Sequence, residues 1–174
     1  MPFTPYHFGP GLLTKSFASK YFSFGAFAAT QVVIDCETLY YILQNEYPIH
    51  RVLHTFLGAT LVGIALAIVI LGLKQFGKSV SSKFSDSLNM RWPSLRSESS
   101  VIGIFLGGII GGVTHPLLDG LMHRDVQPFA PWSSANPFLD KIGVAPLHTG
   151  CLVAGIIGFV LMGIWLYREN NKGS

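Results

Sequence analysis

The sequence predicts an all-α fold, a polytopic membrane helical bundle that forms a single domain of 174 residues. Hydrophobic residues make up 49% of the chain and charged residues only 12%, whereas about a quarter of the residues in a soluble domain are charged. The mean hydropathy of +0.45 likewise indicates a chain more apolar than a soluble domain. Three apolar runs have the length of about 20 residues that a helix needs to cross the hydrocarbon core of a bilayer. The three predicted spans are Val52–Leu73, Val101–Met122 and Leu147–Tyr167.

The segment between the first two spans, residues 74–100, predicts the orientation of the chain in the membrane. It is serine-rich and carries an excess of lysine and arginine over acidic residues. Because short cytoplasmic loops are enriched in basic residues, this loop is expected on the cytoplasmic side. Two further crossings return the C-terminal tail, with Arg168 and Lys172, to the same side. The two basic segments therefore predict one orientation.

The first fifty residues allow two arrangements. In one, Tyr21–Leu43 crosses the membrane as a fourth span, although it contains Asp35 and Glu37, and charges in a membrane usually face a site. In the other, Pro10–Ser19 and Phe22–Val33 form a shallow helical hairpin. We favour the hairpin because it returns the N-terminal His7 to the same end as Asp35, a preference that assumes a shared site.

Glycines recur every four residues along the second span. Small residues at this spacing let helices approach closely in lipid, so we expect this span to pack tightly against its neighbours. The glycines form two ridges, Gly103, Gly107 and Gly111 on one and Gly108 and Gly112 on the next.

The six histidines of the chain avoid the basic loop and the C-terminal tail. In the predicted topology, histidines open the first span, close the second and open the third, so they meet at one face of the membrane. Most of the acidic residues fall in the segments at that same end. The histidines are His7, His50, His54, His115, His123 and His148, and the acids are Asp35, Glu37, Glu46, Asp119, Asp125 and Asp140.

Spacing within this set favours metal coordination. Residues four apart lie on one face of a helix, which predicts a stripe of His115, Asp119 and His123 and a pair of His50 and His54. Imidazole and carboxylate are ligands that zinc and manganese accept. Pro116 is expected to bend its helix and turn the stripe inward. One such histidine more often caps a helix or contacts a headgroup, but the combined set is expensive inside apolar helices unless it is paired or metal-bound.

Four short motifs follow one another in a familiar order. They are "TPYHFGPG" with His7, "VIDCE" with Asp35 and Glu37, "HRVLHT" with His50, Arg51 and His54, and "THPLLDG" with His115 and Asp119. The order resembles that of the YdjM-like family of bacterial inner-membrane-associated metal-dependent hydrolases. The resemblance covers residues 1–60 and 110–135. It departs from the family pattern at Glu37, at the order HT in place of TH, and after His123, where "RDVQPFAP" replaces a turn containing threonine and glycine.

This resemblance implies a metal-dependent hydrolase in the inner membrane of a bacterial or archaeal cell, with the site on the face opposite the basic loop. The expected cofactor is a divalent ion, zinc or manganese, and the expected partners are membrane lipid and a lipid-phosphate substrate. Glu37 is predicted as the general base or a shared ligand, His50 and His123 as proton donors to a leaving oxygen, and Arg51 and Arg124 as phosphate contacts. The predicted metal ligands are His7, Asp35, His54, His115 and Asp119.

Two other functions fit the same residues. A transporter or ion channel also holds acids and histidines in membrane helices, but usually near the midplane. A haem-binding membrane anchor needs two histidines on facing helices, for which His54 and His115 are candidates. Nucleic acid is not an expected partner because the basic residues are scattered. The two cysteines, Cys36 and Cys151, predict no disulfide framework.

Overall fold

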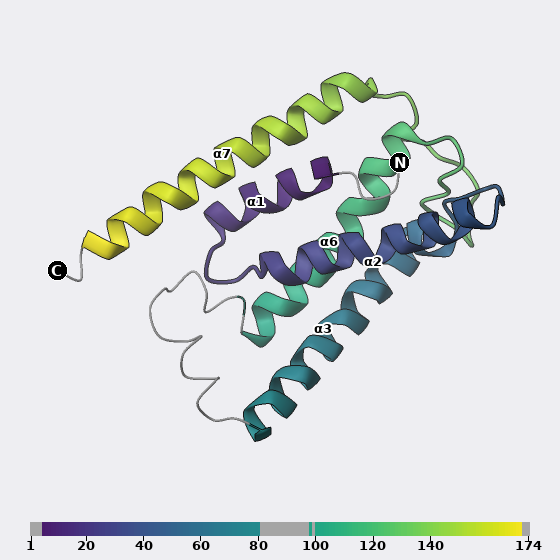
Figure 1. The fold of residues 1–174 in the computed structure, drawn as a ribbon. Helices are drawn as coiled ribbons and strands as arrows, with labels where there is room; N and C mark the ends of the chain where they lie inside the picture. The colour runs from purple at the N-terminus through teal and green to yellow at the C-terminus, as the bar shows by residue number, and fades with distance from the viewer. Residues whose placement is uncertain (1–4, 81–97, 99, 172–174) are drawn as a thin grey trace.

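The computed structural model describes residues 5–80, 98 and 100–171, and the regular elements of this part of the chain are all helices (Figure 1). Three helices are long and apolar enough to cross a membrane, over Phe56–Phe76, Val101–Met122 and Val144–Arg168, which confirms the predicted membrane bundle. The middle span has the predicted bounds. Most of the predicted basic loop lies outside the described residues, and the helix before it continues to Val80. The helices are α1 (Phe8–Phe17), α2 (Phe24–Leu43), α3 (Phe56–Val80), α6 (Val101–Met122) and α7 (Val144–Asn171), with 3-10 helices at Pro5–His7 and Val52–His54.

The N-terminal segment forms the helical hairpin. A short turn separates the end of α1 from Ser23, which caps α2 by accepting a hydrogen bond from the backbone N–H of Ala26. The second helix of the hairpin ends at Leu43 rather than at the predicted Val33. The hairpin returns His7 to the level of Asp35, as the favoured arrangement required.

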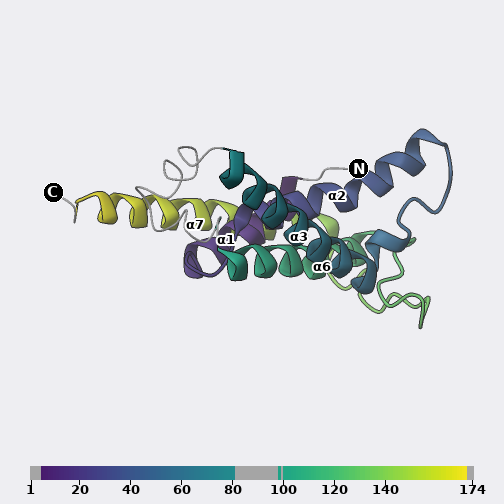
Figure 2. The same cartoon turned by 90° about the horizontal axis from the view of Figure 1, so that it is seen from below.

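Helix α6 lies at the centre of the molecule, with α3 packed on one side and α2 on another, while α1 packs along α7. The starts of α1, α3 and α7 and the ends of α2 and α6 gather at one end, at the right of Figures 1 and 2. We refer to this end, together with the connections 44–55 and 123–143, as the histidine end. The C-terminal end of α7 lies at the opposite end.

The glycine ridges of α6 form the two helix contacts, which confirms the prediction of close packing. A Cβ atom on Gly108 would lie 2.3 Å from the carbonyl oxygen of Gly63 in α3, and one on Gly107 would lie 2.2 Å from that of Ser23. At Gly112 the same atom would lie 2.4 Å from the carbonyl oxygen of Ala59. The backbones of α2, α3 and α6 therefore touch directly, and this contact sets the position of the polar residues further along α6.

Gly63→Ala is expected to lower the free energy of unfolding by about 1–3 kcal/mol, because backbone atoms must move to admit the methyl group. The new Cβ atom would lie only 2.1 Å from the carbonyl oxygen of Gly108. Gly72→Ala on the same helix is the matched control, since a Cβ atom there has no neighbour within 4 Å. Unfolding in detergent, followed by circular dichroism, should separate the two variants, and equal stabilities would contradict the packing described here.

A buried ion pair holds the other end of the hairpin, and the sequence did not predict it. The Nζ atom of Lys15 lies 2.6 Å from Oε1 of Glu98, and the Lys15 side chain is 3% exposed. Glu98 also accepts hydrogen bonds from the Ser23 hydroxyl and from the backbone N–H groups of Phe24 and Gly25. The carboxylate therefore neutralises Lys15 and caps the start of α2, where the helix dipole favours negative charge.

Glu98→Gln is expected to destabilise the protein by about 2–4 kcal/mol, because a buried lysine loses its carboxylate. Burial opposes ionisation of Glu98, but the bonds from Lys15 and Ser23 outweigh it and hold its pKa below 4.5. A carboxylate whose pKa is lower in the folded than in the unfolded protein stabilises the fold at pH values above its unfolded pKa. This stabilisation is lost as pH falls through the folded pKa. The difference in unfolding temperature between wild type and variant should therefore narrow below pH 4.5. A difference in unfolding temperature that does not change with pH would show that the Glu98 carboxylate does not stabilise the fold through its charge. Glu46→Gln, which removes the carboxylate of an exposed ion pair, is the control.

Candidate metal centre

Asp119 lies at the centre of a group of buried histidines at the histidine end. Its Oδ1 atom is 3.2 Å from Nε2 of His7, and its Oδ2 atom is 3.4 Å from Nε2 of His115 and 3.5 Å from Nε2 of His54. Asp35 joins the group through an Oδ1 atom 3.7 Å from Nε2 of His115. These residues form the Asp119 cluster: His7, Asp35, His54, His115 and Asp119. The structure thus brings together the residues that were predicted as metal ligands.

The cluster draws on separate segments of the chain. One turn of α6 separates His115 from Asp119, so both point into the bundle, and α6 continues through Pro116 without interruption. Asp35 comes from α2, and His7 and His54 end the two 3-10 helices. Each side chain is at most 8% exposed. A site built from four segments depends on the tertiary fold and cannot form on one helix alone.

Two of the predicted helical patterns are wrong. Helix α6 ends at Met122, and the backbone of the following His123 is extended, so the stripe does not continue through that residue. His50 and His54 precede the start of α3 at Phe56 and do not share a face of an α-helix. Their rings nevertheless meet edge to face, with centroids 4.6 Å apart. The chain folds these histidines together through its loops.

The Nδ1 atom of each of three histidines contacts an oxygen acceptor. That of His54 lies 3.0 Å from Oε2 of Glu37, that of His50 lies 2.9 Å from Oδ1 of Asp125, and that of His115 contacts Oε1 of Gln31. An acceptor at Nδ1 keeps the proton there, so Nε2 carries the lone pair with which imidazole binds a metal. In all three rings Nε2 is the atom that faces Asp119. Metal-binding histidines are oriented by this kind of outer partner.

The distances between the Asp119 oxygens and the histidine nitrogens fit ligands of one metal ion better than they fit direct hydrogen bonds. A charge-assisted N–H···O bond is about 2.7–2.9 Å long, which is shorter than the separations of 3.2–3.5 Å from His7, His54 and His115. Two ligand atoms at about 2.0–2.2 Å from a tetrahedral zinc ion are roughly 3.4 Å apart. Among the described residues, the buried side-chain atoms without a hydrogen-bond partner are both ring nitrogens of His7, Nε2 of His115 and Nε2 of His148, and three of these four belong to the cluster. The donor set therefore fits a divalent cation.

His50, His123 and Asp125 form a second group beside the first. Each offers a ligand atom within 4.8 Å of the others, and the rings of His50 and His123 stack with centroids 4.5 Å apart. Burial lowers the pKa of His50 and of His123, so both are neutral at neutral pH. Burial opposes ionisation of Asp125, but the hydrogen bond from His50 lowers its pKa. These are the protonation states in which the groups bind metal, and His50 Nε2, 3.9 Å from Asp119, joins the two groups.

Glu37 and Arg51 make contacts with neighbouring groups that the sequence did not predict. The Glu37 carboxylate accepts bonds from the backbone N–H groups of Arg51 and Leu53 as well as from His54. Burial opposes its ionisation, but these bonds hold its pKa below the usual value. The guanidinium of Arg51 donates to Glu46 and lies over the ring of Tyr41. Glu37 thus positions His54, and Arg51 is itself held by its neighbours.

Arg124 and His148 lie at the edge of the site. The Arg124 side chain is 82% exposed and faces Asp140 at 3.9 Å, which places it at the surface. The His148 ring stacks on Tyr6, next to His7 in the chain, with centroids 4.3 Å apart. Neither residue belongs to the Asp119 cluster or to the group of His50, His123 and Asp125.

Comparison with known families identifies the relationship suggested by the motifs. The model of the YdjM inner membrane protein family matches residues 8–173. The chain belongs to this family. The match covers nearly the whole sequence and includes the basic segment that the motifs left uncovered. No curated protein and no solved structure matches the chain.

Three polar residues of this YdjM family protein were missed in the sequence because each is uncharged and sits in an apolar helix. Gln31 contacts His115 and donates from its Nε2 atom to the Thr114 hydroxyl, 3.1 Å away. The Thr38 hydroxyl lies 3.2 Å from Nε2 of His54. A signal was present, since Gln31 precedes Asp35 by one helical turn on α2. Buried amides and hydroxyls need hydrogen-bond partners, so this turn indicates a polar face.

The positions of His54 and His115 bear on the haem alternative. Their rings meet edge to face with centroids 5.0 Å apart. This contact leaves no room for a flat macrocycle between the two rings. The pair that was considered as haem ligands instead belongs to the cluster around Asp119.

Proposed function

We propose that this YdjM family protein is a membrane-bound metal-dependent hydrolase that acts on a phosphoester of an amphiphilic or lipid substrate. The observation that carries the proposal is the orientation of His50, His54 and His115. Each ring is held at Nδ1 by an acceptor and directs Nε2 toward the buried carboxylate of Asp119. A structural histidine has no need of this arrangement, whereas a ligand does.

The residues of the Asp119 cluster would hold zinc or manganese. A divalent ion bound there would supply acidified water as the nucleophile, since metals lower the pKa of bound water to about 7. Glu37 keeps His54 in the tautomer that coordinates. His50 and His123, stacked beside Asp119, are placed to exchange a proton with a leaving oxygen, the step that general acid–base catalysis requires.

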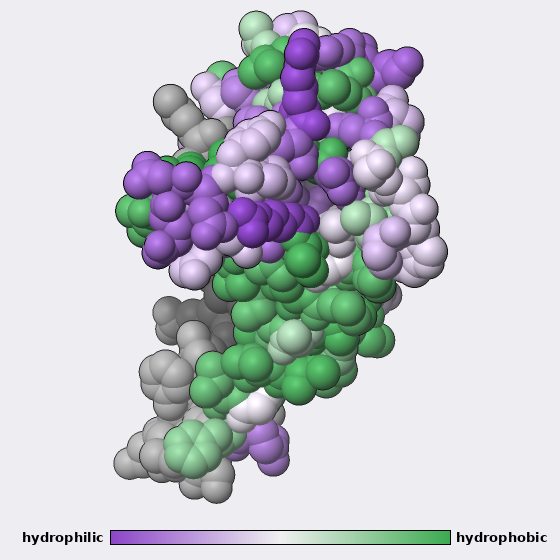
Figure 3. Space-filling view, turned by 90° about the vertical axis from the view of Figure 1, so that its right-hand side faces the viewer, coloured by the Kyte–Doolittle hydropathy of each residue, from purple (hydrophilic) through white to green (hydrophobic). Residues whose placement is uncertain are grey.

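The position of the cluster supports an amphiphilic substrate. Hydrophilic surface gathers at the histidine end, and hydrophobic surface continues directly below it (Figure 3). The boundary between the two is where the headgroup of a lipid meets its chains. We place this end on the face opposite the basic loop and the C-terminus, with those segments in the cytoplasm, because of the distribution of lysine and arginine.

Hydrolysis of phosphoesters before and after metal removal tests the proposal. Purified protein should hydrolyse a short-chain phosphatidate or a soluble aryl phosphodiester. Chelation should lower the rate on the order of 100-fold or more, and zinc or manganese should restore it. A chelated protein that retains its full rate, or a metal-loaded protein without hydrolysis of either substrate, would contradict the proposal. Flux of the metal into protein-containing vesicles would instead favour the transporter.

A further inference from the structure

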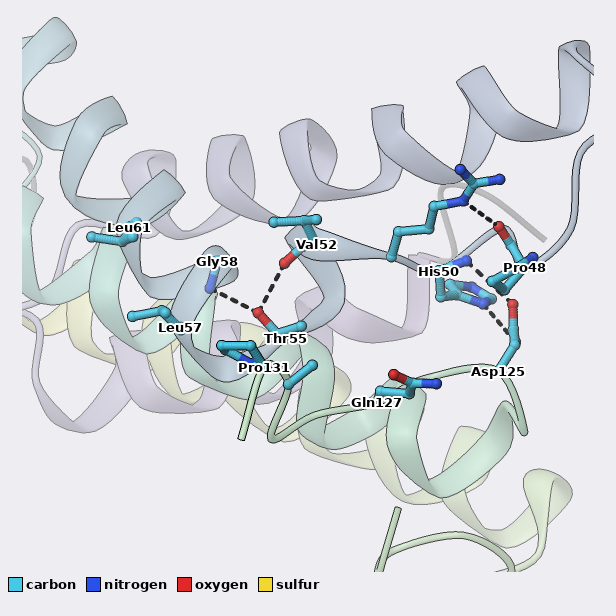
Figure 4. A pocket seen from close by; sticks show the side chains of 12 residues that line it. Pro48, His50, Val52, Thr55, Leu57, Gly58, Leu61, Asp125, Gln127 and Pro131 are labelled. Carbon is cyan, nitrogen blue, oxygen red and sulfur yellow. Dashed lines mark hydrogen bonds and ion pairs between the residues drawn. The ribbon is translucent and has the colours of Figure 1, made fainter. Parts of the chain in front are cut away.

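A cavity of about 440 Å³ lies between the start of α3 and the loop that follows α6. Its size falls within the range of about 300–1,000 Å³ that is common for small-molecule sites. Leu57, Gly58 and Leu61 of α3 line one part of it, and His50 and Asp125 line another. Figure 4 shows the leucines at one end of the row of lining side chains and the polar pair at the opposite end. The cavity therefore has an apolar end and a polar end.

The apolar end opens toward the bilayer. Leu57 and Leu61 belong to the membrane-spanning part of α3 and are 43% and 56% exposed. In a membrane, the medium that faces such side chains at this depth is the hydrocarbon of lipid. An acyl chain can therefore enter the cavity sideways without leaving its apolar surroundings.

The wall at this end satisfies its own polar groups. The Thr55 hydroxyl donates to the carbonyl oxygen of Val52 at 2.9 Å and accepts from the backbone N–H of Gly58 at 2.9 Å (Figure 4). Gly58 is also in close contact with the preceding 3-10 helix, since a Cβ atom on Gly58 would lie 2.0 Å from the Val52 carbonyl oxygen. This pairing suits hydrocarbon, because a chain beside the Thr55 hydroxyl and the Gly58 N–H would not strip these groups of water.

The polar end is continuous with the Asp119 cluster. His50 lines the cavity and directs its Nε2 atom toward Asp119 at 3.9 Å. Asp125 lies within hydrogen-bond distance of His50, and its carboxylate accepts from the backbone N–H groups of Ile49 and His50. The Asp125 carboxylate is therefore already hydrogen-bonded by the protein. A molecule that fills the cavity therefore reaches His50, which lies between the cavity and the Asp119 cluster.

We propose that the cavity binds the acyl chain of a membrane lipid that enters from the bilayer beside α3, with the headgroup directed to His50 and the Asp119 cluster. The reaction of that headgroup rests on the proposed function. Binding of the chain does not, because it depends only on the apolar wall. The two can therefore be tested separately.

Photo-crosslinking in vesicles tests chain binding. The probe is a lysophosphatidylglycerol with a diazirine midway along its single acyl chain, and crosslinks are located by mass spectrometry of peptides. We expect them to concentrate in the peptide that carries Leu57 and Leu61. Leu61→Trp, which fills the cavity, should lower the yield at least fivefold. Leu73→Trp is the matched control, because Leu73 is 66% exposed on the same helix and lies about 18 Å further along it, and its yield should equal that of wild type.

Crosslinks spread evenly over the exposed residues of α3 and α7, or a yield unchanged in Leu61→Trp, would overturn the proposal. Metal content and unfolding temperature of the same samples show whether the variant is folded, and Leu57→Trp replaces it if it is not. Concentrated crosslinks in a protein without metal or hydrolysis would contradict the proposed function and leave chain binding supported. A metal-loaded, active protein without concentrated crosslinks would support the proposed function and overturn chain binding.

Discussion

Asp119→Asn is expected to lower the affinity for zinc or manganese by more than roughly 100-fold, since loss of an outer-shell partner alone lowers affinity by about 10–100-fold. Asparagine has the shape of aspartate but lacks its charge. The Asp119 side chain is 3% exposed and faces Nε2 atoms from four histidines, His7, His50, His54 and His115. The other carboxylate of the cluster, Asp35, has its Oδ1 atom 3.7 Å from Nε2 of His115. Asp119 is therefore the group whose loss removes most of the attraction for a cation.

Competition with a chelating dye measures this change directly in detergent. Asp140→Asn is the matched control, because it removes an exposed carboxylate, 74% accessible, at the same end of the molecule. The control should bind metal as the wild type does. Equal affinities for Asp119→Asn and wild type would show that the cation does not bind where the histidines converge.

Glu37→Ala is expected to weaken metal binding by about 10–100-fold without removing a ligand. The Glu37 carboxylate holds Nδ1 of His54 and the backbone N–H groups of Arg51 and Leu53. Without it, the His54 proton is no longer confined to Nδ1, and three donors lose their acceptor. The free energy of unfolding should also fall by about 1–3 kcal/mol because of these unpaired donors.

The visible spectrum of cobalt-substituted protein separates a positioning role from simple destabilisation. If Glu37 orients His54, the cobalt bands should shift in Glu37→Ala below its unfolding temperature, and Glu37→Gln, which keeps one acceptor oxygen, should shift them less. Glu46→Ala removes an exposed carboxylate next to Arg51 and should leave the spectrum unchanged. A lowered stability with unchanged bands and affinity would reduce Glu37 to a structural residue.

The membrane helices could be predicted from the sequence because hydropathy is a property of each segment alone. The bounds of α6 follow from the apolar run between Ser100 and His123. The placement of His54, His115 and Asp119 at one end also followed, since alternating spans return their ends to the same face, whereas His7 and Asp35 joined them only through the hairpin that a shared site favoured. Both results rest on length and composition, which need no knowledge of neighbouring segments.

The start of α3 and the extended backbone at His123 could not be predicted, because distant residues decide them. The backbone N–H of Phe56 donates to the carbonyl oxygen of Pro128, which fixes the start of α3 beyond His54. The side chain of Asn136 donates to the carbonyl oxygens of Gly120 and His123 and so caps the end of α6. A reading of helical periodicity extended both helices through their histidines. The pairing of Lys15 with Glu98 was missed for the same reason, as the two residues are separated by 83 positions.

The central claim is that the histidines converge on a metal ion, and elemental analysis of purified protein tests it most directly. Wild type and His115→Ala should be purified side by side without added metal or chelator. We predict one or two zinc or manganese ions per chain of wild type, and a content lowered by roughly tenfold or more in His115→Ala. A folded wild-type protein that contains no divalent metal and takes none up on incubation with zinc and manganese would contradict it, as would an unchanged content in His115→Ala.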